Sequence, residues 1–390
     1  MQPDSQNSVS LVVGVPRETM TGERRVAITP DVVRKLSRTG FRFLVERGAG
    51  EGSSFLDSMY EAVGAEIVPD AATLYGAATI VVKVQRPTDA EVSALKPGTI
   101  LIALLQPLVS PDLVVRLSEQ RITAMSMDAI PRITRAQSMD ALSSMSTVAG
   151  YKAVLLAANS LQKFFPLLMT AAGTIRPAKV LVLGAGVAGL QAIATARRLG
   201  AVVEAFDTRP VVKEQVQSLG ASFVELEVGH EEAQDAGGYA KELSEDHIRR
   251  EIELIRDHAA KSDVVITTAL IPGRPAPVLL PEETVKAMGP GSVIVDLAAE
   301  MGGNCELTVS GETVVRYDVT IMGLLNLPSS MATDASQMYA KNISTLLEHL
   351  APKGQLNLDM EDAITRGIVV TRDGEILHGP TLAWAKGGVA

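Results

Sequence analysis

Short apolar runs alternate with amphipathic stretches along most of this chain. In the first part the apolar runs cover residues 11–15, 41–46, 80–84, 99–105 and 122–126, and an amphipathic helix is expected over 30–39. Runs of this length, separated by helical or turn-rich stretches, indicate the strands of a parallel sheet that helices cover on both faces. The pattern therefore predicts a doubly wound α/β domain.

A second series of strands begins near Ala178 and includes the following expected runs: 223–226, 264–268, 292–297, the stretch around Val314, and 320–322. Between the two series a long helix is predicted over about residues 137–165, ended by Pro166. After Pro328 the pattern predicts a helix near 332–350 and a short hairpin that turns at Asp373-Gly374.

These elements predict two Rossmann-like, doubly wound parallel-sheet domains with a cleft between them. The first domain is expected to be discontinuous, with residues 10–140 and 328–390, and the second to cover residues 141–327. A polar insert at about 227–256 carries Gly238 and Tyr239, and we interpret it as a mobile loop over a ligand. A solvated loop that leads into a charged helix is the alternative.

The strongest chemical signal is a strand, a glycine turn, a helix and a second strand that ends in Asp207. Gly184 permits the sharp turn, Gly186 lets a pyrophosphate approach the backbone, and Gly189 lets helix and strand pack closely. The free N–H groups at the start of the helix favour the negative charge of the pyrophosphate. The segment therefore predicts a dinucleotide site.

Asp207 bears on the choice of dinucleotide. It lies about 20 residues after the glycine turn, where a carboxylate accepts hydrogen bonds from both hydroxyls of the adenosine ribose. The same carboxylate repels the additional phosphate of NADP, whereas Arg209 is able to pair with it. We give more weight to the acid at the strand end, and the sequence predicts NAD(H).

A second polar group lies just before the long helix. Ligands bind beyond the carboxyl ends of strands in doubly wound sheets, so this group is expected to face the cleft. The spacing of Gln137, Asp140 and Ser143 places these three side chains on one face of a helix start. Together with Arg132, they are able to bind the carboxamide of a nicotinamide ring. The alternative is that Ser138 or Gln137 only caps the helix.

Composition excludes several classes of function. The 390 residues carry a net charge of −9, which provides no basic surface for nucleic acid or anionic lipid. The single cysteine, Cys305, excludes an internal disulfide framework and is interpreted as a packed residue. We expect a soluble protein with no secretory signal, no membrane-spanning segment and no metal site.

Several segments resemble the alanine dehydrogenase/transhydrogenase family, and the likeness covers residues 11–380. They are Pro16-Arg-Glu18, Gly22-Glu-Arg-Arg-Val-Ala-Ile-Thr-Pro30, Val82-Lys-Val-Gln-Arg-Pro87, Pro131-Arg-Ile-Thr-Arg-Ala-Gln-Ser-Met-Asp140, Gly184-Ala-Gly-Val-Ala-Gly-Leu-Gln191, Gly237-Gly-Tyr-Ala-Lys241, Thr267-Thr-Ala-Leu-Ile-Pro-Gly273 and Asp296-Leu-Ala-Ala-Glu-Met-Gly-Gly-Asn304.

The resemblance implies roles for individual residues. Arg132, Asp140 and Ser143 would hold the nicotinamide carboxamide. Gln137 would lie at the junction with NADP(H) on a partner, and Tyr239 would close on the bound nucleotide. Further expected cofactor contacts are Leu270, which would line the adenosine or ribose region, and Ser138, Met139, Val187, Thr208 and Gly238.

Within the family, the chain looks most similar to the NAD(H)-binding component of proton-translocating NAD(P) transhydrogenase. That likeness implies direct, Si/Re-specific hydride transfer between NADH and NADP⁺ held on a partner domain. It also implies a homodimer that works with an NADP(H)-binding domain and a membrane proton channel. The chain would then be cytoplasmic and peripherally attached to the inner membrane through these partners.

The main alternative is an alanine dehydrogenase, because oxidative deamination needs a general acid or base. In that branch of the family a histidine and an aspartate do this work, and an arginine and a lysine bind the substrate carboxylate. This chain keeps Arg25 and Lys83, but Gln106 and Glu300 stand where the histidine and the aspartate would be. None of its five histidines precedes His230.

Transfer between two nicotinamides needs no such base, so the sequence favours a transhydrogenase. A non-catalytic NAD(H)-sensing subunit is a third hypothesis. Arg25 and Lys83 are interpreted as structural ion pairs, and a ligand held by these two residues is the alternative.

Overall fold

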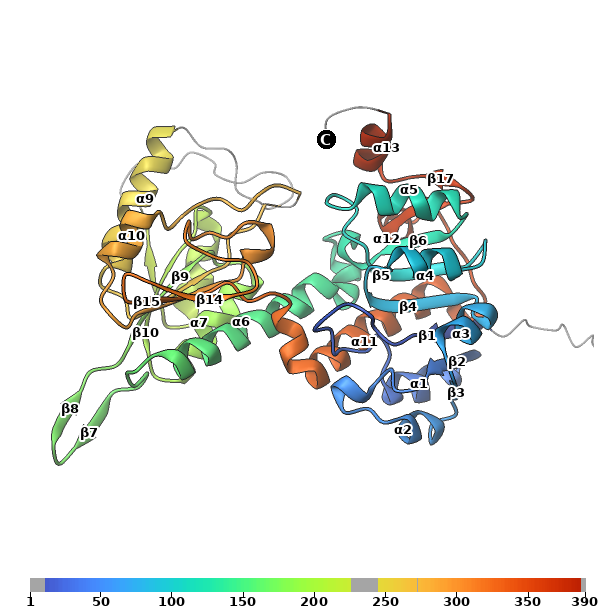
Figure 1. Cartoon of the computed structure of the whole chain (residues 1–390), viewed down its shortest axis with the longest axis horizontal. Coiled ribbons are helices and arrows are strands. Elements are labelled where there is room, and N and C mark those ends of the chain that lie inside the picture. The colour runs from blue at the N-terminus through green and yellow to red at the C-terminus, as the bar shows by residue number, and fades with distance from the viewer. Residues whose placement is uncertain (1–10, 226–244, 272, 387–390) are drawn as a thin grey trace, which may run out of the picture. The chain divides into compact units, whose positions relative to one another are not determined.

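The computed structural model describes residues 11–225, 245–271 and 273–386, and for 245–247 and 353 only the backbone. The chain divides into two compact units. Unit 1 comprises Met1–Met145 and Ser329–Ala390, and unit 2 comprises Ser146–Pro328. Each unit is an α/β domain around its own sheet (Figure 1).

The sheet of unit 1 has eight strands in the order β17-β16-β6-β5-β4-β1-β2-β3. Strands β1 to β6 are parallel, so their order is the 3-2-1-4-5-6 of a doubly wound fold. Strands β16 and β17 add an antiparallel edge through β6. The bounds are β1 Leu11–Val15, β2 Phe41–Glu46, β3 Glu66–Val68, β4 Ile80–Gln85, β5 Ile100–Leu104, β6 Thr123–Ser126, β16 Val369–Arg372 and β17 Glu375–Ile376.

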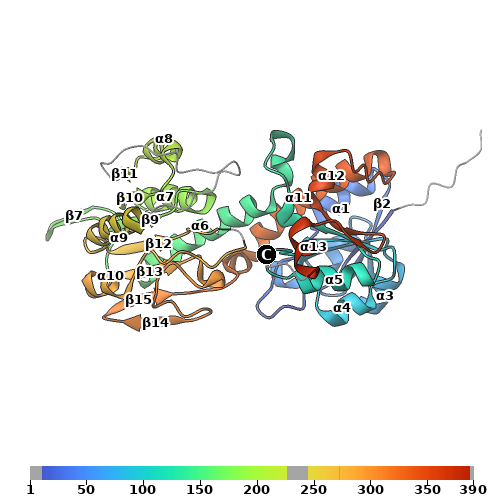
Figure 2. The ribbon, with the colours of Figure 1, turned by 90° about the horizontal axis from the view of Figure 1, so that it is seen from above.

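Helices cover both faces of this sheet. Figure 2 shows α1, α11 and α12 on one side and α3, α4 and α5 on the other. Leu74, Val92 and Leu117 from the second group lie in one buried cluster with Val81 and Leu101 of the strands. The helices are α1 Pro30–Ser37, α2 Asp57–Glu61, α3 Ala71–Ala77, α4 Asp89–Ala94, α5 Pro111–Glu119, α11 Ala332–Leu350, α12 Ala363–Ile368 and α13 Gly379–Ala385.

Unit 2 repeats the same strand order. Its seven-stranded sheet runs β11-β10-β9-β12-β13-β15-β14, and all of its strands except β14 are parallel. The bounds are β9 Lys179–Leu183, β10 Val202–Phe206, β11 Ser222–Val224, β12 Val264–Thr267, β13 Val293–Asp296, β14 Thr313–Arg316 and β15 Val319–Met322. The helices are α6 Ala141–Ser160, which begins in unit 1, α7 Val187–Arg198, α8 Lys213–Ser218, α9 Glu245–Ala259 and α10 Glu282–Ala287.

The residues of β9 show why this sheet is buried on both faces. Val180 and Val182 lie in one core cluster with residues of α6 and α7, and Leu181 and Leu183 lie in another with residues of α9 and α10. Successive strand residues point to opposite faces, so an unbroken apolar run needs a helix layer on each side. This confirms the predicted fold class of two Rossmann-like, doubly wound sheets.

The long helix predicted over residues 137–165 is wrong at both ends. Residues Thr134–Met139 form a 3-10 helix, α6 begins at Ala141, and it ends at Ser160. Asp140 interrupts the helix because its carboxylate accepts the backbone N–H of Ser143, which is an N-cap bond. Beyond Ser160 the apolar side chains continue into the core of unit 2 without helical backbone, which is why the sequence pattern extends too far.

Gly150 in α6 has a packing reason that the sequence does not reveal. A β-carbon built on Gly150 would lie 2.1 Å from the carbonyl oxygen of Ala188 in the first turn of α7. The two helices therefore touch backbone to backbone, and only glycine permits this distance. The helix that carries the glycine turn is thus held by a direct contact with α6.

Helix α6 is also long and apolar enough, by length and composition alone, to cross a membrane. Core helices of soluble proteins pass the same test. Ala153, Val154 and Ala157 of α6 belong to the main buried cluster of unit 2, as expected for a core helix. The other described residues contain no helix that passes. The sequence expectation of no such segment therefore overlooked α6.

The predicted mobile loop at about 227–256 needs a correction. Residues 245–256 belong to α9, which buries Ile255 and Ala259 against the sheet of unit 2. The charged surface of this helix explains why its sequence is typical of a loop. The part of the insert that contains Gly238 and Tyr239 lies outside the described residues.

A small hairpin that the sequence pattern did not predict extends from unit 2 (Figure 1). It consists of β7 Leu168–Thr170 and β8 Gly173–Ile175, which pair only with each other. Met169 is 78% exposed, and Leu167 and Ile175 are also exposed. Its strands of three residues are too short to give a periodic signal in the sequence.

Candidate functional site

In a doubly wound sheet, ligands bind outside the carboxyl ends of the strands where the strand order reverses. That position is between β9 and β12 in unit 2 and between β1 and β4 in unit 1. The two units fill it differently, and this difference defines the candidate site.

In unit 2 the position carries the glycine turn. Gly184 has φ +94°, and a β-carbon on Gly189 would lie 1.9 Å from the carbonyl oxygen of Gly184. A β-carbon on Gly186, in contrast, would have no atom within 4 Å. Gly184 and Gly189 are therefore required by the fold itself, whereas the space beside Gly186 is open to a ligand.

The start of α7 faces the same space. Gly186 is the N-cap residue and has no side chain to cap the helix. The first N–H groups of α7 accordingly have no side-chain acceptor at the cap and present partial positive charge. Val187 is 42% exposed. An uncapped N-terminus beside open space is suited to a phosphate group.

Asp207 follows the end of β10, next to the glycine turn. Its carboxylate accepts hydrogen bonds from the backbone N–H of Ala185 at 2.7 Å and of Arg209 at 2.9 Å. The guanidinium of Arg209 donates to both carboxylate oxygens, from Nε at 2.9 Å and from Nη2 at 2.8 Å. The Asp207 side chain is only 6% exposed. Arg209 therefore pairs with Asp207 itself.

Three residues that were not predicted from the sequence shape the third wall of the site. The hydroxyl of Thr268, just after β12, donates to the carbonyl oxygens of Leu183 and Gly184 at 3.2 Å each. Buried Asn304 binds both backbone groups of Ala269. Asp296 accepts four hydrogen bonds, from the hydroxyls of Thr267 and Thr308 and the backbone N–H groups of Ala298 and Cys305.

These bonds fix the loop that leads to Leu270, which is 44% exposed. Thr208 follows Asp207 and is half-buried. The structure thus brings the predicted residues of unit 2 together around the glycine turn. The only sequence signal for Asp296 and Asn304 was their polarity directly after a buried strand.

The polar segment before α6 lies in unit 1. Arg132, Gln137 and Ser138 are exposed, whereas Met139 is only 4% exposed, so its side chain packs inside the unit. The amide of Asn342, in α11, donates to the carbonyl oxygen of Ser138 at 2.9 Å and anchors this segment.

Asp140 determines how α6 begins. Its carboxylate accepts the Ser143 backbone N–H at 2.9 Å and the Ser143 hydroxyl at 2.5 Å. The suggestion that Ser138 or Gln137 caps the helix is therefore wrong. Gln137 also lies on the 3-10 helix and not on α6, so the proposed common helix face does not exist.

At the corresponding position of unit 1, charged side chains of the chain itself fill the space. Lys83, in β4, is 1% exposed and lies 2.6 Å from a carboxylate oxygen of Glu91 and 3.5 Å from one of Glu18. Glu91 also completes the capping box of α4 with Thr88. The backbone N–H of Val84 donates to Glu18 at 2.5 Å.

A second buried ion pair adjoins the first. The Arg25 guanidinium lies 2.6 Å from a carboxylate oxygen of Glu23, and both side chains are at most 2% exposed. The Gln85 side-chain amide donates to Glu23, and its backbone N–H donates to Glu18, which links the two pairs. Arg25 also donates to the sulfur of Met145.

This buried charge cluster, defined as Glu18, Glu23, Arg25, Lys83 and Glu91, has three carboxylates and two cations. Burial raises the pKa of Glu18 to about 6, although Lys83 opposes this rise. Burial also acts to raise the pKa of Glu23, but the hydrogen bond and charge of Arg25 outweigh it and lower that pKa to about 2. The surplus negative charge of the cluster therefore falls on Glu18.

The two residues that stand in place of an acid and a base have structural contacts. The Gln106 side-chain oxygen accepts a hydrogen bond from Arg86 at 3.2 Å, and the Glu300 carboxylate accepts the backbone N–H of Asn326 at 2.8 Å. Gln106 does not titrate, and Glu300 belongs to unit 2. Within the described residues, no group of three or more His, Cys, Asp or Glu side chains could hold a metal ion.

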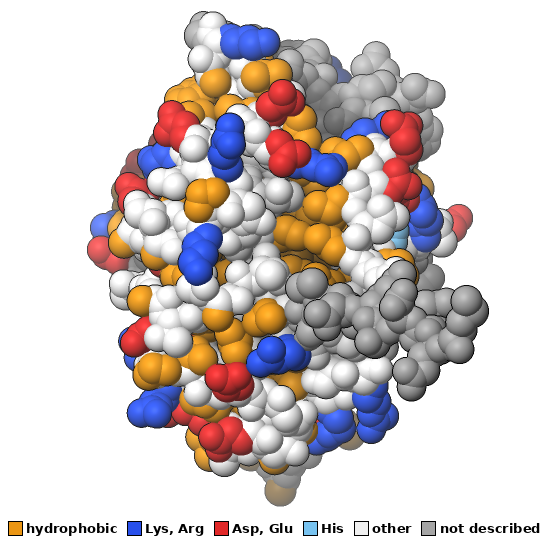
Figure 3. Space-filling model, turned by 90° about the vertical axis from the view of Figure 1, so that its right-hand side faces the viewer, with side chains coloured by type: hydrophobic (Ala, Val, Ile, Leu, Met, Phe, Trp, Pro, Cys, Tyr) orange, Lys and Arg blue, Asp and Glu red, His pale blue; other side chains and the backbone are white. Residues whose placement is uncertain are grey.

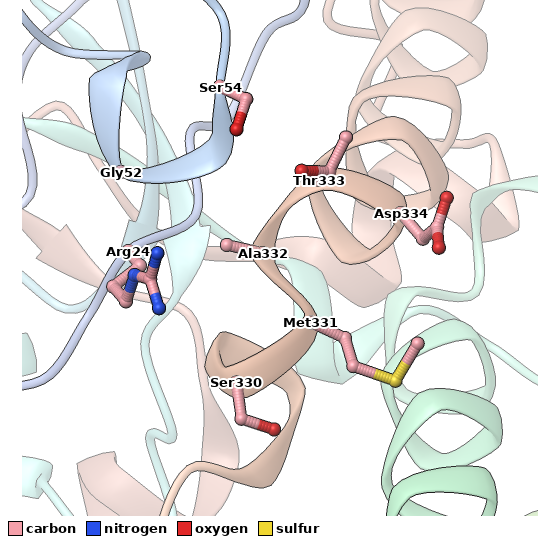
Figure 4. Close-up of a pocket in the computed structure, with 8 residues that line it drawn as sticks. All are labelled: Arg24, Gly52, Ser54, Ser330, Met331, Ala332, Thr333 and Asp334. Atoms are coloured by element: carbon pink, nitrogen blue, oxygen red, sulfur yellow. The ribbon is translucent and has the colours of Figure 1, made fainter.

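Unit 1 also has a hollow of about 220 Å³ where α11 begins. Figure 4 shows Arg24, Ser54 and Thr333 around it, from three separate segments. The residues that line it are Arg24, Gly52, Ser54, Ser330, Met331, Ala332, Thr333 and Asp334. None of them is a predicted site residue. On the face in Figure 3, basic and acidic side chains are interspersed.

Taken together, unit 2 has the features of a dinucleotide-binding domain: the strand order, the glycine turn, the uncapped helix and the carboxylate after β10. Family models identify the chain more closely. Residues 14–149 match the N-terminal domain of alanine dehydrogenase/PNT, and residues 153–379 match its C-terminal domain. The chain belongs to the alanine dehydrogenase/PNT family.

Relatives in this family include both of its branches. An NAD(P) transhydrogenase alpha subunit of Rhodospirillum rubrum is 49% identical over 374 residues, which cover 94% of this chain and 97% of the relative. The alanine dehydrogenase of Bacillus subtilis is 30% identical over 378 residues, 94% of this chain and 93% of that protein.

A solved structure agrees with this assignment. A transhydrogenase from Sinorhizobium meliloti superimposes with a TM-score of 0.82 at 42% identity, and the match covers 94% of this chain and 99% of that one. The resemblance inferred from the sequence motifs is therefore confirmed.

The buried charge cluster predicts a dependence of stability on pH. The pKa of Glu18 is about 6 in the folded chain and 4.5 by default, so the folded state holds the proton more tightly. Its contribution to stability is lost as the pH rises from about 4.5 to 6. Glu18→Gln mimics the protonated form and should stabilise the chain by about 2 kcal/mol at pH 8 and hardly at pH 4.

Urea unfolding of both proteins at the two pH values measures this difference. Glu23→Gln is the matched comparison, because it removes the carboxylate that pairs with buried Arg25 and should destabilise by about 3 kcal/mol. A Glu18→Gln variant that is less stable than the wild type at pH 8 would show that the cluster has no surplus charge.

Proposed function

We propose that this chain is the NAD(H)-binding component of a proton-translocating NAD(P) transhydrogenase. In this proposal it holds NADH while a hydride passes directly to NADP⁺ on a partner domain. The observation that carries the proposal is the contrast between the two units. The ligand position of unit 2 is open beside Gly186, whereas that of unit 1 is occupied by the chain's own ion pairs.

The filled position argues against a small carboxylic acid as substrate. Arg25 and Lys83 are the residues expected to bind such a carboxylate, and Glu23 and Glu91 already neutralise them at 2.6 Å each. A substrate would have to displace a buried carboxylate from its cation, which is strongly unfavourable. The charge balance of the cluster thus supports structural ion pairs at Arg25 and Lys83.

The chemistry of the remaining residues fits transfer between two nicotinamides. Such transfer changes no protonation state at the reacting carbons, so it needs aligned rings about 3–3.5 Å apart and exclusion of water, but no general base. Gln106 offers no titratable group at the position where the alanine dehydrogenases carry a histidine. The site thus lacks what deamination would require.

Residue roles follow from the geometry and the family resemblance. We assign the pyrophosphate to the N–H groups of α7 beside Gly186 and the adenosine ribose to Asp207. The exposed side chains of Val187 and Leu270 are suited to contact the flat faces of the nucleotide. The nicotinamide carboxamide is assigned to Arg132, Asp140 and Ser143.

The remaining assignments rest on the resemblance alone. Gln137 is assigned to the junction with NADP(H). Gly238 and Tyr239 are proposed to close over the nucleotide. Ser138, Thr208 and the backbone of Met139 are proposed as further contacts to the cofactor.

The partners are proposed on the same basis. The chain would act as a homodimer with an NADP(H)-binding domain and a membrane proton channel, attached to the inner membrane only through them. The hairpin β7–β8 supports the homodimer, because a two-stranded hairpin with exposed apolar side chains is marginally stable by itself. We assign its exposed face to contact with a second copy of the chain.

Met169→Asp tests the dimer assignment. Met169 is 78% exposed, so the substitution leaves the folded unit intact, but it places a charge in the proposed contact. Light scattering should show dimers for the wild type and mostly monomers for the variant. An exposed apolar residue elsewhere, Val315→Asp, is the control and should leave dimers intact. Dimers of unchanged stability in Met169→Asp would contradict the assignment.

Two glycine substitutions test the nucleotide site. Gly186→Ala adds a methyl group in open space, so unfolding should be unchanged while NADH affinity falls at least tenfold, or about 1.4 kcal/mol. Gly189→Ala instead forces the β-carbon onto the Gly184 carbonyl and should destabilise the chain itself. Urea unfolding and titration of NADH fluorescence separate the two effects. Normal NADH affinity in Gly186→Ala would refute the pyrophosphate assignment.

Reconstitution tests the hydride relay. The chain is assayed for NADPH formation from NADH and NADP⁺, with and without an NADP(H)-binding domain. Activity is expected only with that domain, and Gln137→Asn should slow it at least tenfold while NADH affinity stays within about twofold. A complete loss of NADH binding in Gln137→Asn would place that residue in the NAD(H) site. Binding of NADH without any transfer in the presence of the domain would indicate a sensing subunit.

A further inference from the structure

The carboxylate of Asp207 has no free acceptor position. A carboxylate offers about four lone-pair positions. Here four donors fill them: the backbone N–H groups of Ala185 and Arg209, and Nε and Nη2 of the Arg209 side chain. The hydroxyls of a ribose cannot bind to Asp207 in this arrangement unless a donor leaves.

Only the side-chain donors are able to leave without disturbing the fold. Ala185 is buried and follows Gly184, whose N–H donates to the Phe206 carbonyl oxygen at 2.8 Å. The Ala185 N–H is therefore fixed by the strand ends. The Arg209 side chain is 20% exposed, lies on the loop after β10, and reaches Asp207 through rotatable bonds.

We propose that Arg209 is an internal substitute for the adenosine ribose and that it must release Asp207 before NAD(H) binds. The proposal rests on the proposed function, because it concerns the same nucleotide site. The guanidinium presents two parallel N–H donors to the two oxygens of Asp207. A ribose presents its 2′ and 3′ hydroxyls to the same two oxygens, so one pair of donors replaces the other.

The substitute has two consequences. In the empty site it keeps a nearly buried carboxylate paired with a cation and with hydrogen bonds, which avoids the cost of an unpaired buried charge. It also lowers the apparent affinity for any nucleotide by the fraction of molecules in which Asp207 is free. A ligand that lacks a ribose hydroxyl is a poor competitor, because it restores fewer of the lost hydrogen bonds. Arg209 thereby makes the site sensitive to an intact ribose diol.

Arg209→Gln tests the proposal through affinity. The backbone N–H of residue 209 remains, but the charged pair of donors is gone. The variant should bind NADH and AMP roughly threefold to tenfold more tightly than the wild type, because the competing state is weaker. The gain should be smaller for 2′-deoxy-AMP. Arg316→Gln, which removes an exposed arginine on β14, is the control for net charge and should bind as the wild type does.

A second measurement uses the unsubstituted chain. In ¹⁵N spectra of arginine side chains, the Nε–H signal that is missing from Arg209→Gln identifies Arg209. AMP should move this signal toward the position of a solvent-exposed arginine. This readout holds even if the variant folds poorly.

The outcomes distinguish the nucleotide site from the role of Arg209 within it. Failure of the wild type to bind NADH or AMP would overturn the nucleotide site itself. Normal binding by the wild type, with equal or weaker binding by Arg209→Gln or an unmoved Arg209 signal, would overturn only the role of Arg209 as a substitute.

Discussion

The position between the first and fourth strands of a doubly wound sheet must be satisfied, because helix N-termini and strand ends gather unpaired polar groups there. Both units of this chain have the 3-2-1-4-5-6 strand order and therefore face the same requirement. Unit 2 leaves the position open to a ligand, with Gly186 at the helix start. Unit 1 closes it with Glu18 and Lys83 from the chain itself. The assignment of function depends on this division of roles.

The division explains how one family contains both a dehydrogenase of a small substrate and a chain without one. Buried cations are tolerated only with partners, so Arg25 and Lys83 need either a bound carboxylate or an internal one. Glu23 and Glu91 provide internal carboxylates here. On a smaller scale, Asp207 and Arg209 in unit 2 repeat the principle, since the carboxylate that would hold the ribose is paired until a ligand arrives.

The sequence predicted the strands and the glycine turn well, because buried parallel strands are continuous apolar runs and each glycine has a distinct steric reason. It failed where side-chain chemistry interrupts a periodic pattern. Asp140 ends the 3-10 helix and starts α6, although the apolar spacing continues through it. The pairing of Arg209 with Asp207 could not be predicted, because it depends on the path of the loop after β10. The contact that requires Gly150 joins helices whose packing no local pattern encodes.

In the proposed function, NADH held by this chain gives its hydride to a second nicotinamide and to no small substrate. The most direct test incubates the chain and an NADP(H)-binding domain with NADH deuterated at the transferred position. NADP⁺, pyruvate and ammonium are all present as competing acceptors, and mass spectrometry locates the deuterium. We predict deuterium in NADPH, with none in alanine and none lost to water. Deuterated alanine would contradict this assignment.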